Sequence, residues 1–574
     1  MVEEQSQRQS RLRQCQHGNT NVSIARTRRV RRNLIILPGI LSGWCLPIPV
    51  FAFQVIEPAL QSNRLPLGFP VTTQLHAMEN DPSDGFDDNP DVSGVFVDGY
   101  PLPAIPKFNR TLSTTSFLHS DATPRLEDWT KPVTSRSLLS HTASPLRVLV
   151  AGGGLGGLAV ASQLQRLRIP IQVLVVEQAR QYQPFGGPIQ LQSNALWALE
   201  QIDPVLLQAI QACGVVTGDR LSGIKDGKRY QEGWLVKFDA ATPALRKGLP
   251  LTLAINRVAL QEILLTYGFP RNRVVTNRRV VSYHNVQDTD GDNDSQQSGV
   301  QVDFQDGSHV YADILIGADG IWSRVRHQMM GLPSSEVGPS FAAKHASYSG
   351  YTCYTGTCRH TPADIHEVAY KVFLGQEQYL GCTDTGHGWQ HWWAFLPDPP
   401  PAVGEGPPQL TEGCEQETMY LERLLDEFQD WSPEILDLFR ATDPEVVKKR
   451  PLFDRPPMWK NGWVSGNVAL MGDAAHPTMP NLGQGGAMAI EDAYVLGQEL
   501  QEIQHTNDIH ELLKSYERRR FLRASIAQFL SRNGSDLLVD WDKVRNTPIL
   551  GPIAMKCVNI FQPMSMDFLY SADF

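Results

Sequence analysis

The sequence predicts an α/β protein in which a Rossmann-type nucleotide-binding fold, assembled from separate stretches of the chain, carries an inserted mixed β-sheet. Three observations support this. A short apolar strand at 147–150 runs directly into a G-x-G-x-x-G pattern that begins at Gly152. A second apolar strand run lies within 312–320, and a third, 467–473, leads into a loop rich in Gly and Pro. Apolar strands that alternate with glycine turns and helical stretches are typical of a parallel sheet.

The amino terminus has the composition of a targeting signal. Residues 1–52 contain eight Arg and two Glu, and they include most of an apolar run from Leu34 to Phe53. A basic region followed by an apolar run and a small residue at its exit is typical of a secretory signal. The alternative is a membrane anchor, because the run is about long enough to span a bilayer. Three prolines inside the run disfavour a stable helix, so we expect removal of the segment.

The motif VFAFQ, from Val50 to Gln54, resembles the cleavage site of the bipartite plastid signals of algae with secondary plastids. It predicts a plastid location, reached through the secretory route. Residues 53–145 would then form a transit and linker segment that is largely flexible. The acidic stretch from Met78 to Asp98 departs from the acid-poor composition of transit peptides.

The body of the chain has a globular composition, with 41% hydrophobic and 20% charged residues. The net charge is −10, and the body is more acidic still because the targeting segment is basic. Such a balance disfavours nucleic acid as a partner. The cysteines form no C-x-x-C pair, and the calcium-like run Asp288–Asp294 lacks the glycine and the final acid of a calcium loop. We therefore expect no metal site.

A nucleotide-binding signal follows the first strand, where Gly152, Gly154 and Gly157 precede a helical stretch. The first glycine allows a tight turn, the second lets backbone N–H groups approach a pyrophosphate, and the third lets the helix pack close to the strand. Glu177 ends the next strand, where a carboxylate binds ribose hydroxyls. The pattern indicates a dinucleotide with an unphosphorylated ribose, so FAD or NAD fits better than NADP.

Two later strand ends extend this signal. One strand ends at Gly317 and is followed by Asp319-Gly320, and another ends at Asp473 and opens the loop GDAAHPTMPNLGQGG. A helix that begins near Gly485 directs free N–H groups toward whatever lies before it, and such an end stabilises negative charge. The small residues of this loop would let its backbone approach the edge of an isoalloxazine ring, with Asp473 accepting hydrogen bonds from the ribityl hydroxyls.

In this order, the three motifs resemble those of the single-component flavoprotein monooxygenases of the aromatic-hydroxylase type. Longer stretches narrow the resemblance to the zeaxanthin epoxidases: Gly186–Asp203, Val236–Leu264 and Tyr348–Thr357. The resemblance extends from about Arg147 to about Arg523. Plant members carry a C-terminal forkhead-associated domain, for which we expect no counterpart in this chain.

The resemblance implies a set of cofactor-binding residues: Gly152, Gly154, Gly157, Glu177, Arg257, Asp319, Asp473, Pro477, Gly483, Gly485 and Gly486. The first three glycines would hold the FAD pyrophosphate, and Glu177 the adenosine ribose. Arg257 would reach the phosphates or the ribityl chain. Asp319 is linked in the family to both FAD and NAD(P)H binding, and no second G-x-G-x-x-G is present. Asp473 would bind the ribityl chain, and Pro477 and the later glycines would border the flavin ring.

The resemblance also implies a reaction. Reduced FAD would react with O2 to form a C4a-hydroperoxyflavin, which epoxidises the ring double bond of a carotenoid, with NADPH or reduced ferredoxin as electron donor. The xanthophyll would be zeaxanthin, giving antheraxanthin and violaxanthin, or diatoxanthin, giving diadinoxanthin. No protein nucleophile is needed, and His476, a candidate acid or base near the flavin, is more often structural in such a loop. Two alternatives stay open: a flavin-dependent isoprenoid reductase or dehydrogenase, and a catalytically degenerate member with a structural or pigment-delivery role.

The motifs divide the chain into a targeting segment (1–52), a linker (53–145), a first FAD-binding part (146–340), a substrate-side sheet (341–450), a second FAD-binding part (451–535) and a tail (536–574). Trp389, Trp392 and Trp393 indicate sheet packing with one face toward the substrate. No apolar run after Phe53 is long enough for a transmembrane helix. The apolar tail Ile549–Tyr570 would either contact a thylakoid or envelope membrane peripherally or pack against the FAD domain.

Overall fold

A computed structural model of the chain describes residues 96–97, 100–101, 103–107, 125–139, 144–182, 186–287, 297–332, 346–400, 414–458, 462–539 and 564–572. The predicted targeting segment, most of the linker and the calcium-like run lie outside the described residues. The part of the tail from 540 to 563 also lies outside them.

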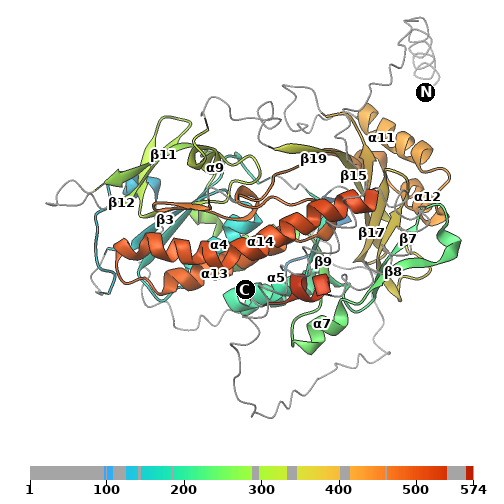
Figure 1. Ribbon diagram of the computed structural model, residues 1–574, viewed down its shortest axis with the longest axis horizontal. Helices are drawn as coiled ribbons and strands as arrows, with labels where there is room; N and C mark the ends of the chain where they lie inside the picture. Colours follow the sequence, from blue (N-terminus) through green and yellow to red (C-terminus); the bar gives the residue numbers. More distant parts are fainter. Residues whose placement is uncertain are drawn as a thin grey trace, which may run out of the picture. The chain divides into compact units, whose positions relative to one another are not determined.

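A six-stranded, mostly parallel sheet forms the centre of the nucleotide-binding part (Figure 1). In spatial order its strands are β10 (Val274–Val275), β4 (Ile171–Val176), β3 (Leu146–Ala151), β14 (Ile314–Gly317), β21 (Val468–Leu470) and β20 (Val464–Ser465). The first five strands run parallel and β20 is antiparallel at the edge. β3 and β4 are almost continuously apolar and buried, as expected for parallel strands covered on both faces.

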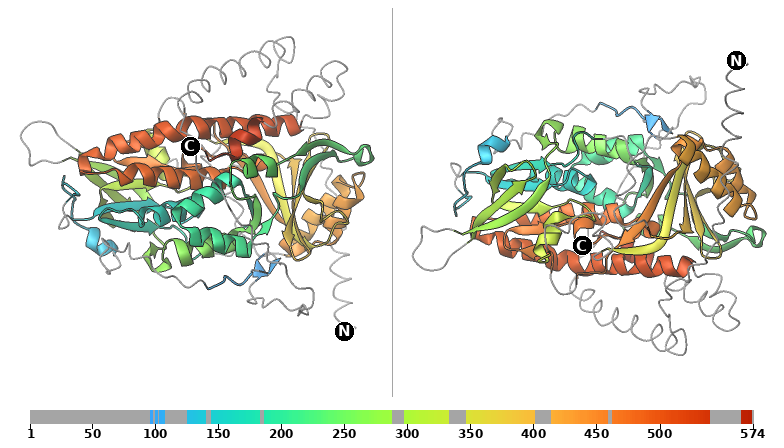
Figure 2. Two further views of the ribbon diagram at one scale, coloured as in Figure 1. Left: turned by 90° about the horizontal axis from the view of Figure 1, so that it is seen from below. Right: turned by 90° about the horizontal axis from the view of Figure 1, so that it is seen from above.

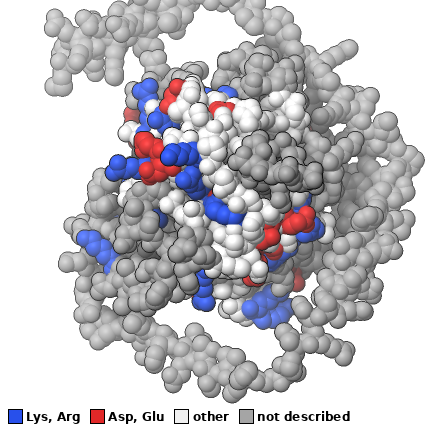
Figure 3. Space-filling model, turned by 90° about the vertical axis from the view of Figure 1, so that its left-hand side faces the viewer, with Lys and Arg blue, Asp and Glu red and all other residues white. Residues whose placement is uncertain are grey.

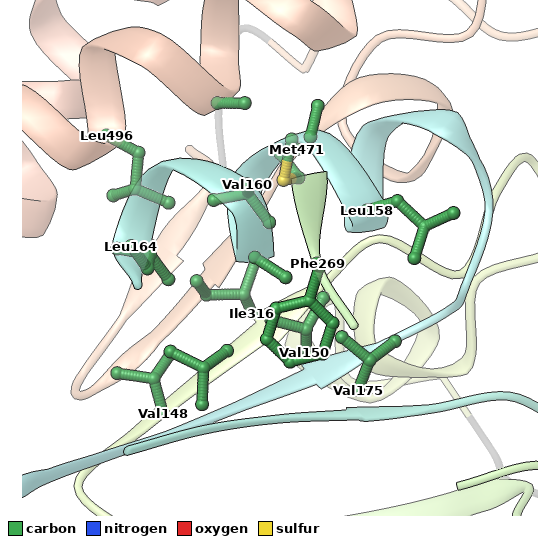
Figure 4. Close-up of a cluster of buried hydrophobic side chains, with 14 of the residues drawn as sticks. Val148, Val150, Leu158, Val160, Leu164, Val175, Phe269, Ile316, Met471 and Leu496 are labelled. Carbon is green, nitrogen blue, oxygen red and sulfur yellow. The ribbon is translucent and has the colours of Figure 1, made fainter. Parts of the chain in front are cut away.

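Helix α4 (Leu155–Leu164) packs against this sheet, and α13 (Gly485–Gln501) packs against α4. Figure 4 shows Val150 of β3, Leu158 of α4 and Ile316 of β14 within one buried cluster. α14 (Ile509–Val539) lies beside α13, as Figure 2 also shows. This packing holds the carboxyl ends of the central strands and the start of α13 in one rigid arrangement.

A seven-stranded sheet forms the second part of the molecule. In spatial order its strands are β19 (Lys448–Asp454), β15 (Ser347–Arg359), β18 (Trp389–Pro397), β17 (Tyr379–Gly386), β16 (Val368–Leu374), β7 (Leu221–Asp226) and β8 (Trp234–Phe238). β16 and β7 pair in parallel and the other neighbours are antiparallel. The sheet is therefore mixed.

The limits of this sheet differ from the predicted 341–450 segment. β7 and β8 come from the stretch predicted to be entirely part of the first FAD-binding segment, and β19 continues to Asp454. Local sequence patterns show that β7 is a strand, but they do not show which distant strand it pairs with. α14 likewise runs through the predicted boundary at 535.

The two faces of the seven-stranded sheet have different partners. On the outer face, Trp392 packs against Phe439 of α12 (Pro433–Arg440) at a ring distance of 4.9 Å. Its indole Nε1 donates a hydrogen bond to Thr442 Oγ1 at 2.9 Å. Trp393 points to the opposite, inner face, since successive side chains alternate along a strand. One tryptophan is thus core, while its neighbour faces the nucleotide-binding side.

A small antiparallel sheet connects the two parts, with β9 (Leu253–Asn256) between β5 (Pro188–Leu191) and β6 (Val215–Val216). It abuts the inner face of the seven-stranded sheet, where Gln190 Nε2 lies 3.5 Å from Thr383 Oγ1. A third, antiparallel sheet consists of β11 (Val280–Gln287), β12 (Gln297–Phe304) and β13 (His309–Ala312).

Surface features add two observations. On the side shown in Figure 3, Lys and Arg lie among Asp and Glu, so the described part of that face carries no extended basic area. Among the helices that the structure describes, none is both long enough and apolar enough to cross a membrane.

Candidate active site

The candidate site lies at one edge of the six-stranded sheet, where four neighbouring parallel strands end. Glu177 follows β4, Gly152 follows β3, Asp319 lies two residues beyond β14, and Asp473 lies three residues beyond β21. The carboxyl ends of parallel strands are where open α/β sheets bind ligands. The structure thus brings together predicted site residues that are far apart in the sequence.

The glycine turn between β3 and α4 is tightly packed. Gly152 has a φ of +112°, and a Cβ placed on it would lie 2.4 Å from the Ala318 carbonyl oxygen. A Cβ on Gly157 would lie 1.9 Å from the Gly152 carbonyl oxygen. Gly154 differs, since a Cβ there would meet no described atom within 4 Å. Two of the three glycines therefore allow the turn to form, and the third leaves space in front of it.

Glu177 is held at the end of β4 by backbone donors. Its Oε2 accepts a hydrogen bond from the N–H of Gly153 at 2.8 Å, and its Oε1 accepts one from Ala179 at 2.8 Å. A carboxylate offers about four acceptor positions. Both oxygens can therefore accept further hydrogen bonds from ribose hydroxyls while Glu177 stays in place.

Asp319 lies next to the glycine turn, since a Cβ placed on Gly152 would approach its Cα to 3.1 Å. Its Oδ2 accepts hydrogen bonds from the N–H of Arg324 at 2.8 Å and of Val325 at 3.4 Å, which fixes the start of α9 (Arg324–Met329). Its Oδ1 is buried and has no partner among the described residues. Burial raises the pKa of Asp319, while the Ser323 side chain and then the backbone N–H donors oppose that shift. An acceptor is thus left over at the centre of the site.

Asp473 and Arg257 form the other end of the site. Burial raises the pKa of Asp473, although His476 and Arg257 oppose that shift, and burial lowers the pKa of Arg257. Solvent nevertheless reaches both side chains. Side chains that are surrounded by protein atoms and remain accessible to solvent are typical of the walls of a binding cleft. Asp473 Oδ1 would lie 3.9 Å from a Cβ on Gly485, so it faces the start of α13.

The amino terminus of α13 supplies free backbone donors. Its N-cap residue, Gln484, makes no side-chain capping hydrogen bond, and Gly485 and Gly486 form its first turn. A Cβ on Gly486 would meet no described atom within 4 Å. Gly483, just before the helix, has a φ of +64°, which a glycine adopts without strain. The uncapped N–H groups of a 17-residue helix therefore face open space and favour a negatively charged or carbonyl group there.

The loop before α13 is held by Asp492, about two turns into that helix. Asp492 Oδ2 accepts hydrogen bonds from the N–H of Gly472 at 2.9 Å and from His476 Nε2 at 2.6 Å. Its Oδ1 accepts one from Arg520 Nε at 2.8 Å. Burial alone would raise the pKa of Asp492. His476 and Arg520 outweigh this effect and lower the pKa to about 2. His476 Nε2 therefore serves to fix the loop, which supports the structural interpretation of this histidine.

Glu491 continues the same buried network. It pairs with Arg523 Nη2 at 2.8 Å and with Arg520 Nη1 at 2.6 Å. It also accepts a hydrogen bond from Asn194 Nδ2 at 2.6 Å, and Asn194 Nδ2 in turn lies 3.2 Å from Gln484 Oε1. Both acids are completely buried. The network thus connects α14, α13 and the residue that precedes the open helix terminus.

A second cation supports the loop from the side of α9. Arg326 is 3% exposed, and its Nη1 lies 3.3 Å and 3.4 Å from the carbonyl oxygens of Ala474 and Ala475. Burial, and then the neighbouring Arg455, lower its pKa to about 9. Gln528 Nε2 donates to the carbonyl of Pro477 at 3.0 Å. The loop is therefore fixed along most of its length by side chains.

Sequence reasoning did not identify the acids and arginines of this network as functional. One signal for them exists, since Glu491-Asp492 interrupts an otherwise apolar helical run, and Arg520 and Arg523 recur three residues apart in a second helix. Residues spaced in this way lie on one face of a helix. Charges on a face that must be buried need partners.

The residues present fit FAD. Space lies in front of Gly154 and Gly486, acceptors remain at Asp319 and Asp473, and free N–H groups point from α13. Gly154 and Glu177 would hold the pyrophosphate and ribose. Asp473 would hold the ribityl hydroxyls, and the helix terminus would face the carbonyl edge of the flavin. Direct binding of FAD by each of these residues stays a prediction.

Comparison with known proteins agrees with this site. A family described as an FAD binding domain matches residues 443–529. Chloroplastic zeaxanthin epoxidases from Prunus armeniaca and Solanum lycopersicum are 39% and 41% identical over 396 and 398 residues. Each match covers 67% of this chain and 54% of the relative. Over these residues the chain is similar to the zeaxanthin epoxidases. It spans about half the length of these curated relatives.

The fold is shared with solved flavin enzymes. The structure of Klebsiella pneumoniae HpxO complexed with FAD and uric acid matches with a TM-score of 0.59 at 24% identity, covering 74% of this chain and 97% of that one. The predicted Rossmann-type FAD-binding fold with an inserted mixed sheet is confirmed.

Two glycine substitutions separate folding from cofactor binding. Gly157→Ala is expected to lower the free energy of unfolding by about 3 kcal/mol, because its Cβ would collide with rigid backbone. Gly154→Ala meets no protein atom, so it should keep the stability of the apoprotein and weaken FAD binding about tenfold or more. Urea unfolding and flavin titration measure the two effects. Equal stability of the two variants would contradict this assignment.

The Asp492 contact predicts a dependence of stability on pH. Its pKa of about 2 lies below the unfolded value of 3.8, so its contribution is complete above pH 4 and is lost as the pH falls toward 2. Asp492→Asn should cost about 3 kcal/mol at pH 7, since it leaves Arg520 and His476 without their acid. The matched control is Glu499→Gln on the same helix, whose partner Arg519 is partly exposed. Unfolding midpoints that are the same for both variants would refute the role of Asp492.

Proposed function

We propose that the chain is an FAD-dependent monooxygenase that epoxidises the ring double bond of a xanthophyll. The substrate would be zeaxanthin or diatoxanthin, and the reductant NADPH or reduced ferredoxin. When bound, reduced flavin supplies the activation of O2. The observation that carries the proposal is an apolar, aromatic sheet face in the same molecule as a site whose residues fit FAD.

That apolar face is the inner face of the seven-stranded sheet. Its side chains form a buried cluster separate from the outer one: Tyr351, Cys353, Val372, Leu374, Tyr379 and Phe395, joined by Ile224, Leu235, Tyr370, Trp393 and Leu452. Tyr379 and Phe395 stack at 4.2 Å, and Tyr370 lies 5.7 Å from Trp393. Large aromatic surfaces suit an apolar ligand that offers few hydrogen-bonding groups. An elongated isoprenoid has that chemistry.

His391 lies at the end of this face nearest the small sheet and is 6% exposed. Burial lowers the pKa of His391 to about 4, so the imidazole is neutral at physiological pH. Its Nδ1 lies 3.1 Å from the Gly356 carbonyl, which makes Nδ1 the donor. A Cβ on Gly187 would lie 2.5 Å from His391 Cε1. The chain thus packs tightly here, which helps to exclude water from the reacting atoms.

Two alternatives share the same FAD-binding features. A reductase or dehydrogenase acting on an isoprenoid would change the substrate without adding oxygen. A degenerate member would bind pigment and turn nothing over. The apolar inner face is compatible with both, so the reaction itself must decide between them.

The decisive experiment is turnover under labelled oxygen. The protein with FAD, a reductant and zeaxanthin or diatoxanthin should yield an epoxide that carries one atom from 18-O2. Asp473→Ala and Glu177→Ala should each lose flavin, since a lost charged hydrogen bond costs roughly 1.5–3 kcal/mol. Glu499→Gln serves as the control and should keep its flavin. An oxygen-free product would indicate the reductase, and no product with any reductant would indicate the degenerate member.

We also propose that the protein works in a plastid, peripherally attached to a thylakoid or envelope membrane. The curated relatives are named as chloroplastic, and a xanthophyll is dissolved in lipid. Leu522 and Phe529 of α14 are 45% and 47% exposed and lie seven residues apart, on one face of the helix. This face offers an apolar contact for a bilayer surface.

A flotation assay tests the membrane contact. The double variant Leu522→Ser with Phe529→Ser should keep FAD and lose most of its binding to liposomes of chloroplast lipids. Leu139→Ser, which removes an exposed leucine elsewhere, is the matched control. Unchanged flotation of the double variant would exclude this face of α14 as the contact.

A further inference from the structure

A cavity of about 400 Å3 lies on the outer face of the seven-stranded sheet, and none of the residues that line it belongs to the candidate active site. Lys371 of β16, Cys382 of β17 and Gln390 of β18 line it from the sheet, and Leu438 lines it from α12. Cys382 is the register partner of both Lys371 and Trp392. Directly opposed residues point to the same face of a sheet, so these side chains share the face against which α12 packs.

The cavity is large enough for a small molecule and opens to solvent. Ligand pockets have volumes of roughly 300–1,000 Å3, and an apolar cavity of about 150 Å3 is sufficient for benzene. Val368 and Leu438 are buried and give the cavity apolar walls. Thr361 and Ala363 also line it and are exposed. A ligand can therefore enter from this side without displacing the core of the protein.

The acids and the lysine that line the cavity are already paired. Lys371 is 4% exposed, and its ammonium binds Asp364 Oδ1 at 2.6 Å and Glu434 Oε2 at 2.5 Å. Glu434 also pairs with Lys225 at 3.1 Å. Asp437 pairs with the arginine three residues later in α12 at 3.4 Å. A charged ligand would have to compete with these pairs and lose its own hydration, so the cavity favours a neutral one.

One polar group of the cavity wall lacks a partner. Gln390 is 3% exposed, and its Nε2 has no hydrogen-bond partner among the described residues. By contrast, Trp392, two residues further along the same strand and on the same face, donates to Thr442 Oγ1 at 2.9 Å. Buried donors in folded proteins are paired with protein, water or ligand acceptors, because an unmade hydrogen bond is unfavourable. A molecule that completes this site must therefore offer an acceptor.

We infer that this cavity is a second ligand-binding site, which takes a neutral, largely apolar molecule whose carbonyl oxygen accepts a hydrogen bond from Gln390. The walls at Val368 and Leu438 supply the apolar contact. A carbonyl accepts this bond without adding a donor that would need a partner of its own. The inference goes beyond the proposed function, since it requires neither FAD nor a xanthophyll.

Two probes of similar size test the site, acetophenone with a carbonyl and ethylbenzene without one. Each is titrated into the full chain, with and without FAD, and binding is followed by ligand-observed NMR. Gln390→Leu should weaken acetophenone about three- to tenfold and leave ethylbenzene unchanged, because only the hydrogen bond is lost. Ala363→Trp, at the exposed rim, should weaken both probes by filling the entrance. The matched control is Gln376→Leu, an exposed glutamine between β16 and β17, which should bind both probes as wild type does.

The outcomes are distinct from those of the proposed function. Acetophenone affinity that is equal in wild type, Gln390→Leu and Ala363→Trp would overturn the inference. Absence of acetophenone binding to the wild type would also overturn it and leave the cavity to water alone. If Gln390→Leu does not fold, Ala363→Trp, at an exposed position, decides by the same titration. Absence of epoxide formation would overturn the proposed function and not this site.

Discussion

The architecture of the site depends on two adjacent carboxylates, Glu491 and Asp492, that are completely buried in α13. Removing a charge from water costs several kcal/mol, and partners offset this cost only when every charge is matched. Here Arg520 and Arg523 match both acids. Because the partners come from other elements, the requirement for pairing fixes those elements relative to α13.

Each carboxylate also has partners outside α14. Asp492 binds the Gly472 amide and His476, which sets the path of the loop between β21 and α13. Glu491 binds Asn194, which lies at the start of α5 (Ser193–Ile202). The open end of α13 is thereby held against the ends of the parallel strands. A preorganised set of donors and acceptors of this kind binds a cofactor without the cost of ordering the loop on binding.

Local patterns were sufficient to predict the strand ends. Gly152, Glu177, Asp319 and Asp473 each follow a short apolar run, and parallel strands place such residues at one edge. The pairing of β7 with β16 could not be predicted, because strand register depends on partners that are far away in the sequence. Asp492 was missed for a related reason, since its role depends on the approach of α14. The packing of Leu569 against Met488 of α13 and Ala527 of α14 likewise depends on tertiary contacts. From the sequence alone, the tail could either contact a membrane or pack against the FAD domain.

The central claim is that Asp492 holds the loop ready for FAD before the cofactor binds. Hydrogen–deuterium exchange of the apoprotein, followed in peptides that cover 467–486, tests this directly. The Gly472 amide donates to Asp492 in the closed arrangement, so it should exchange slowly in the wild type and at least about tenfold faster in Asp492→Asn. Exchange that is equally fast in both proteins, or equally slow, would contradict the claim.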